Sequence, residues 1–150
     1  MERRKFLSLT AGIFAMALVP NTMKAEDFRK LKPNAWTATK VDAAIQALYG
    51  RTDMIEKGVF IKAAKIAASG ARVKLKFGSK VPAKSVALLQ DVNPESTVAV
   101  FSVTKYDLMD YQLNIKMAKS GTVTVVAEGL DGNLYVARHK MKVAAGGCEG

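Results

Sequence analysis

Cysteine and histidine are nearly absent from this chain of 150 residues, which has one of each, Cys148 and His139. A single cysteine excludes a disulfide within the chain and a zinc site built from several thiolates. A single histidine likewise excludes a metal site with several imidazole ligands. We therefore expect no metal and no cofactor. The length is enough for one domain with its own hydrophobic core.

A long hydrophobic run is also lacking. The apolar stretch 9–19 is shorter than the roughly 20 residues that a membrane-spanning helix needs. It follows Arg3 and Arg4 and leads into a short polar segment that closes on Ala25. This arrangement resembles a twin-arginine export signal. We expect residues 1–25 to be cleaved after export to the periplasm; an uncleaved membrane anchor is the alternative.

Acidic residues are scarce: the chain has 13, against 23 Lys and Arg, and its formal net charge is +10. Residues 1–25 hold four of the basic residues and one acidic residue, so 19 and 12 remain, a net charge of +7. Between Lys57 and Lys84 there are eight basic residues and no acidic one. Such a surface suits anions or acidic proteins, or consists simply of solvated strand faces. Nucleic acid is not expected as a partner, because the leader predicts export and no aromatic residues interleave with the lysines.

The sequence after the leader begins with one predicted helix. Thr39 is a candidate N-cap, the helix runs through Tyr49, and Gly50 ends it. Its apolar residues are spaced to share one face, as in a helix that packs on a core: Val41, Ala44, Ile45 and Leu48.

Period-two alternation of apolar and polar residues follows the helix and predicts strands. Val73, Leu75 and Phe77, for example, alternate with lysines. Strands are expected at 59–61, 72–77, 85–89, 97–104, 111–117, 122–128 and 133–143, of which 85–89 has the weakest pattern. Asp131 and Gly132 predict a hairpin turn between the last two strands. About seven short strands favour a mainly β, immunoglobulin-like sandwich over residues 26–143.

The last predicted strand carries a basic rib, which we define as Arg138, Lys140 and Lys142 on one of its faces. His139 lies on the other face, where a packed histidine is expected. Residues 144–150 then read Ala-Ala-Gly-Gly-Cys-Glu-Gly. Such small residues cannot build a core, so we expect a flexible arm that carries Cys148. An exposed thiol in an exported protein tends to pair between molecules, so this cysteine is either incidental or has to enter other proteins.

The C-terminal residues resemble those of SoxY, the sulfur-carrier family of the periplasmic thiosulfate-oxidising Sox system. Gly146, Gly147, Cys148, Glu149 and Gly150 are similar to the Gly-Gly-Cys-Gly-Gly end of that family. The similarity continues back through 122–138 and, more weakly, over 81–101. The twin-arginine leader also fits, and the resemblance covers most of 38–150.

The resemblance implies a carrier and not an enzyme, with an immunoglobulin-like sandwich that pairs with a SoxZ-like subunit as a heterodimer. Cys148 would be the attachment point for thiosulfate-derived groups, on an arm formed by Gly146, Gly147 and Gly150. The implied partners are a haem-containing conjugating enzyme, a sulfate-releasing hydrolase and an enzyme that oxidises the remaining sulfane sulfur.

Charges near the thiol bear on this chemistry. Positive neighbours lower the pKa of a thiol, so Arg138, Lys140 and Lys142 favour the thiolate and attract anionic thiosulfate if they lie close to it. Glu149 departs from the glycine of the family, and its carboxylate disfavours the thiolate and repels an anionic adduct.

Two other classes of function compete with the carrier. A secreted anion-binding or adhesion module explains the sandwich and the basic residues, and makes Cys148 incidental. A thiol enzyme is not expected, because a glycine-rich tail cannot hold a base and an oxyanion site in place.

Overall fold

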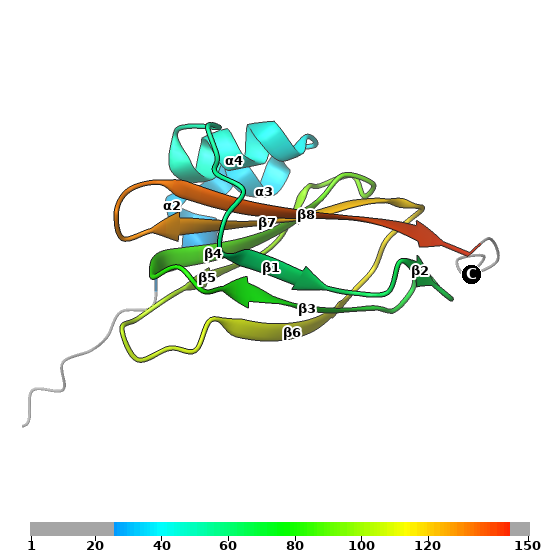
Figure 1. Ribbon diagram of the computed structural model, residues 1–150. Coiled ribbons are helices and arrows are strands. Elements are labelled where there is room, and N and C mark those ends of the chain that lie inside the picture. Colours follow the sequence, from blue (N-terminus) through cyan, green and yellow to red (C-terminus); the bar gives the residue numbers. More distant parts are fainter. Residues whose placement is uncertain (1–25, 145–150) are drawn as a thin grey trace, which may run out of the picture.

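The computed structural model describes residues 26–144, and its strands form two sheets that pack face to face (Figure 1). The smaller sheet has the order β1-β3-β6, with β1 at Val59–Lys62, β3 at Val73–Ser79 and β6 at Asp110–Ile115. The larger has the order β2-β8-β7-β4-β5, with β2 at Ile66–Ala67, β4 at Ala83–Gln90, β5 at Thr97–Ser102, β7 at Gly121–Gly129 and β8 at Leu134–Val143. The predicted mainly β, two-sheet sandwich is confirmed, and its described part has eight strands instead of about seven.

Alternation along β3 builds the core between the sheets. Val73, Leu75 and Phe77 are buried, and the lysines between them are exposed. The Phe77 ring lies 6.2 Å from the ring of Phe101 and 5.6 Å from that of Tyr111, measured between centroids. Phe101 and Tyr111 stack at 4.4 Å. These three rings join both sheets in one apolar cluster. The period-two pattern predicted the burial of Val73, Leu75 and Phe77 on one face, but not this contact between the sheets.

The segment with the weakest strand pattern, 85–89, is a central strand. It lies within β4, which is hydrogen-bonded to β5 on one side and β7 on the other. Val86 and Leu88 face the core between the sheets, and Ala87 and Leu89 face a second core under the helices. A strand buried on both faces reads as a continuous apolar run, so its pattern did not alternate.

Three helices cover the outer face of the larger sheet: α2 at Phe28–Leu31, α3 at Pro33–Thr37 and α4 at Val41–Tyr49 (Figure 1). Only the third was predicted. Thr39 as its N-cap is wrong, because the N-cap is Lys40, which makes no side-chain capping hydrogen bond. Gly50 ends the helix as predicted, at a positive φ of 72° that favours glycine.

The helices are attached to the larger sheet by apolar packing and by hydroxyl groups. Ile45 and Leu48 pack in the second core. Thr97 Oγ1 donates to the carbonyl oxygen of Ala35 at 2.7 Å. The Tyr49 hydroxyl lies 3.3 Å from Ser85 Oγ, and burial raises the pKa of this tyrosine. Within residues 26–144, the helices are all too short or too polar to cross a membrane.

The predicted hairpin joins β7 to β8. Gly132 has a φ of 83°, which glycine adopts without strain. Tyr135 donates a hydrogen bond to Asp131 Oδ2 at 2.5 Å, and this bond holds the pKa of the Asp131 carboxyl below its usual range. The turn is thus fixed by both backbone and side chains, and it places β8 antiparallel to β7 along its length.

Candidate functional site

The residues that the SoxY resemblance singles out lie outside the described part of the chain. These are Gly146, Gly147, Cys148, Glu149 and Gly150, and the same holds for the predicted export signal, 1–25. The described residue nearest to the cysteine in sequence is Ala144. We therefore build the candidate site from the β8 end, defined as residues 140–144 of the chain with β2 and the loops 63–72 and 116–120 beside them.

Hydrogen bonds hold the chain at the β8 end up to the last described residue. Strand β8 pairs with β7 on one side and, through its last two residues, in parallel with β2 on the other. The amide of Val143 donates to Ser120 Oγ at 2.9 Å, and that of Ala144 donates to the carbonyl of Ala67 at 2.9 Å. The chain therefore leaves the sandwich at a defined place. Strand β2 was not predicted, because two residues are too few to show a pattern.

The basic rib lies on the outer face of the larger sheet, beyond the part that the helices cover. Its three side chains are exposed, whereas Leu134 and Val136 on the same face are buried under the helices. Arg138 donates to Glu56 Oε1 at 2.8 Å and forms an ion pair with it. Lys140 and Lys142 form no ion pair within the described residues. The rib is therefore divided: one member is partly neutralised and two are free to act on anions.

The segments beside Lys142 at the β8 end carry further basic residues. They come from segments that are far apart in the sequence: Lys65, Arg72, Lys116 and Lys119, all exposed and none in an ion pair within the described residues. Their segments are tied together, since Met117 donates its amide to the carbonyl of Gly70 and Lys142 to that of Lys65, both at 2.8 Å. Lys116 and Lys119 were not predicted as site residues, because a lysine in a loop gives no indication in the sequence of which loop lies beside it.

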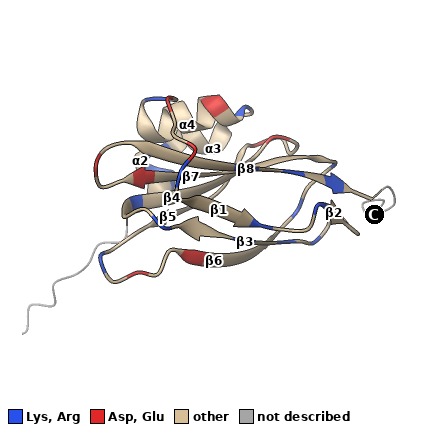
Figure 2. Cartoon of the chain, in the orientation of Figure 1, with Lys and Arg blue, Asp and Glu red and all other residues tan. Residues whose placement is uncertain are grey.

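The other basic residues between Lys57 and Lys84 do not form one site. Figure 2 shows basic residues at several separate places along the chain. Lys76 pairs with Asp110 at 3.0 Å and Lys84 with Glu128 at 4.0 Å. By strand register, Lys62, Lys74 and Lys76 lie on the outer face of the smaller sheet. These residues correspond to the solvated strand faces that were the alternative interpretation.

His139 is half-buried at the edge of the sandwich and is not deep in the core. Its Nε2 atom lies 3.3 Å from the carbonyl oxygen of Ala64. Within the described part of the chain, three or more His, Cys, Asp or Glu side chains nowhere gather closely enough to hold a metal ion.

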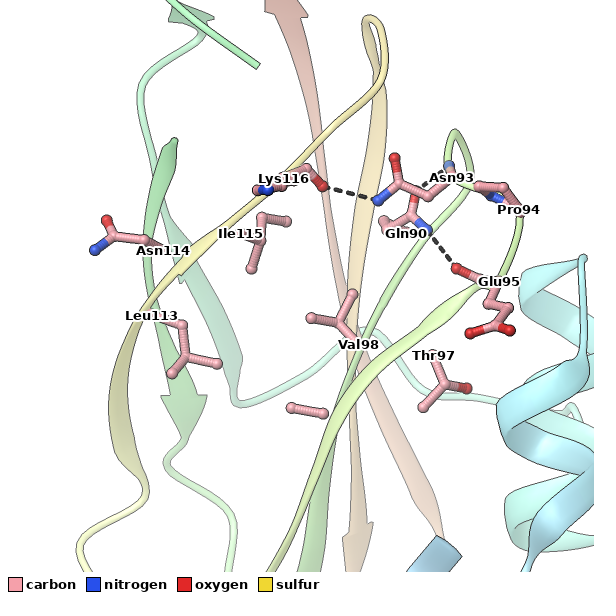
Figure 3. Close-up of a pocket in the computed structure, with 11 residues that line it drawn as sticks. Gln90, Asn93, Pro94, Glu95, Thr97, Val98, Leu113, Asn114, Ile115 and Lys116 are labelled. Atoms are coloured by element: carbon pink, nitrogen blue, oxygen red, sulfur yellow. Dashed lines mark hydrogen bonds between the residues drawn. The ribbon is translucent and has the colours of Figure 1, made fainter. Parts of the chain in front are cut away.

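A groove of about 560 Å³ opens between the edge strands β5 and β6 (Figure 3). Val98, Leu113 and Ile115 supply its apolar lining. Two of the polar groups in view are paired: Gln90 Nε2 donates to the carbonyl of Glu95 at 2.7 Å, and Asn93 Nδ2 to that of Lys116 at 2.8 Å. These bonds shape the loop 91–96, so we assign them a structural role.

Comparison with known proteins identifies relatives of this chain. Residues 45–148 match the protein family described as sulfur oxidation protein SoxY. The structure is similar to that of the sulfur carrier protein SoxY from Chlorobium limicola f thiosulfatophilum, at 32% sequence identity and a TM-score of 0.64, covering 73% of this chain and 96% of that one. It also resembles a superoxide reductase (neelaredoxin) from Ignicoccus hospitalis, at 16% identity and a TM-score of 0.52, covering 59% and 81% of the two chains. The second likeness concerns the fold alone. No curated protein sequence matches.

Proposed function

The chain belongs to the SoxY family of sulfur oxidation proteins, and from this premise we propose that it carries thiosulfate-derived groups covalently on Cys148. The family is one of carriers rather than enzymes. The observation that carries the proposal is that the family match extends through residue 148, the position of the only cysteine in the chain. Membership implies partners of the Sox system, among which we propose a SoxZ-like subunit and, from the export signal, the periplasm as the place of action.

The proposed chemistry begins with two steps on Cys148. In the first, the sulfur of Cys148 bonds to the outer sulfur of thiosulfate; the thiol proton is released and two electrons pass to a haem-containing partner. The product is Cys–S–S–SO3⁻. In the second, a hydrolase directs water to the terminal sulfonate, the S–SO3 bond breaks, hydrogen sulfate leaves and the persulfide Cys–S–SH remains. A further enzyme oxidises that sulfane sulfur. The carrier supplies the thiol, and its partners supply the catalysis.

The lysines of the β8 end support this role by their charge. Lys142, Lys65 and Lys119 lie in the segments that are hydrogen-bonded to one another where the described chain ends, and thiosulfate is a dianion. Unpaired positive charge raises the local concentration of such an ion and favours a nearby thiolate. Glu149 opposes both effects next to the thiol. Because exposed charges are screened beyond about 8 Å at physiological ionic strength, we propose that the lysines act mainly on encounter with the anion.

Mass spectrometry of the purified protein tests the proposal. Protein from cells grown on thiosulfate is expected to carry adducts on Cys148 that are heavier by sulfur atoms or by the S–SO3 group. Reductant should remove them, because each is bound through an S–S bond. A cysteine that stays unmodified under these conditions, in a strain that oxidises thiosulfate through this protein, contradicts the carrier role.

Replacing Lys140 and Lys142 together by glutamine is expected to slow conjugation of thiosulfate about three- to tenfold at low ionic strength, because steering of an anion by positive charge is lost. The difference should vanish at high salt. The measurement is the conjugation rate with the haem-containing partner as a function of ionic strength. A matched control removes two exposed lysines near the other end of the sandwich, Lys80 and Lys105. Equal rates for the two double variants contradict a role for the β8 end.

A further inference from the structure

A second pocket lies between the N-terminus of α4 and the larger sheet, and the proposed carrier chemistry does not use it. Its volume is about 430 Å³. Residues 39–43 line it on the helix side, and Asp91, Thr122, Thr124 and Arg138 line it on the sheet side. Thr124 lies directly opposite Arg138 in the pairing of β7 with β8, so the pocket adjoins the basic rib.

The helix presents unused hydrogen-bond donors to this pocket. Helix α4 has nine residues, and its N-cap, Lys40, makes no side-chain capping bond. The first hydrogen bond of the helix runs from the amide of Ala44 to the carbonyl of Lys40 at 3.0 Å. The three N–H groups before it, those of residues 41–43, thus have no partner within the helix. Together with the helix dipole, such groups favour an anion.

The hydroxyl of Thr124 is a second and independent sign of a ligand. This threonine lines the pocket and is 3% exposed. No hydrogen bond within the described residues uses its hydroxyl, whereas the buried hydroxyl of Thr97 donates to a backbone carbonyl. The hydroxyl is not among the fully buried side-chain atoms that lack a partner, so it is accessible from the pocket. It is free to donate a hydrogen bond to an acceptor atom bound there.

The charged side chains around the pocket set limits on the ligand. Lys40 and Arg138 are positive, and Asp42 and Asp91 are negative. Asp91 already accepts the amide proton of Thr122 at 2.7 Å, and Arg138 is paired with Glu56. Because Arg138 is paired with Glu56, net charge does not favour an anion in the pocket. Selectivity therefore rests on the hydrogen-bond donors: three amides, the threonine hydroxyls and the ammonium group of Lys40. A small ion with several acceptor oxygens matches such a set.

We propose that this pocket binds a small tetrahedral oxyanion, of the class that includes sulfate and the sulfonate end of thiosulfate. The site is noncovalent and does not depend on Cys148, so it stands whether or not the proposed carrier function holds. Bound there, an oxyanion lies beside the rib that leads to the β8 end.

The test is an NMR titration of the ¹⁵N-labelled chain with Cys148 replaced by serine, using sodium sulfate and sodium thiosulfate separately at constant ionic strength. Saturable shifts are expected for the amides of residues 41–43. Thr124→Val, which removes the hydroxyl at nearly constant volume, should weaken binding about tenfold. Asp42→Asn should tighten it about threefold, because a repelling carboxylate is removed. A lower Kd for thiosulfate than for sulfate identifies the site as one for the substrate. A lower Kd for sulfate identifies it as one for the product.

Lys105→Gln, at the other end of the sandwich, is the control and should leave both affinities unchanged. The gain expected for Asp42→Asn is a result that a misfolded protein cannot imitate. Shifts that do not saturate, or that are spread over the exposed lysines and are the same in all variants, overturn the proposal. A response of residues 41–43 that survives both Thr124→Val and Asp42→Asn without change in affinity does so too.

Discussion

Replacing Cys148 by serine is expected to abolish sulfur transfer by this protein completely. The hydroxyl group of serine stays protonated at neutral pH and forms no bond to the sulfur of thiosulfate, whereas a thiolate does. Thiosulfate-dependent oxygen consumption, measured with the partner enzymes, should fall to the level seen without the carrier. No sulfur adduct should appear in the mass spectrum of the variant.

The stability of the Cys148→Ser variant is the internal control for this experiment. The residue lies outside the described sandwich, so the urea midpoint of unfolding should equal that of the wild type. A stable variant that is inactive identifies the thiol as the functional group. Full activity of the variant points instead to the anion-binding module that the sequence left as the alternative, in which the cysteine is incidental.

Phe77→Ala is expected to lower the free energy of unfolding by about 3–5 kcal/mol, the usual cost of removing a large buried ring. Phe77 is fully buried, and its ring contacts those of Phe101 and Tyr111 between the two sheets. Since small domains are stable by only about 5–15 kcal/mol, much of the protein should then be unfolded at mild urea concentrations. Urea titration followed by circular dichroism measures the effect.

The single tryptophan provides a second probe for this titration. Trp36 lies in α3 and packs against the second core, under the helices. Coincident transitions by its fluorescence and by circular dichroism show that the helices and the sandwich unfold together. Lys74→Ala, an exposed neighbour on the same strand, is the control and should change the stability by less than about 0.5 kcal/mol. A cost below about 1 kcal/mol for Phe77→Ala contradicts the packing described for the three rings.

The predictable elements of the fold are the strands and helices that have one buried face and one solvent-exposed face. Alternation in β3 and the apolar stripe of α4 arise from that contrast, and both were found from sequence. Strand β4 was nearly missed because both of its faces are covered. Helices α2 and α3 are four and five residues long, which is too short for a helical pattern to show.

The candidate site shows a similar division. The motif around Cys148 and the alternation of Arg138, Lys140 and Lys142 are local in sequence, so they were visible without a structure. The ion pair of Arg138 with Glu56, and the position of the segments that carry Lys65, Lys116 and Lys119, depend on how distant parts of the chain pair. Strand order and loop placement arise only when the chain folds, and local patterns such as alternation and turn motifs do not predict them.

The bond between Ala144 and Ala67 sets how far the thiol can travel. Cys148 is the fourth residue after Ala144, and four Cα-to-Cα steps span at most about 13–14 Å when fully extended. In the proposed carrier role, the reacting group of a partner enzyme therefore has to come within that distance, plus the length of the cysteine side chain, of the sandwich surface at β2. A catalytic channel deeper than this is closed to the carrier unless its mouth is wide enough to admit the tip of the sandwich, or unless β2 separates from β8 and lengthens the tether.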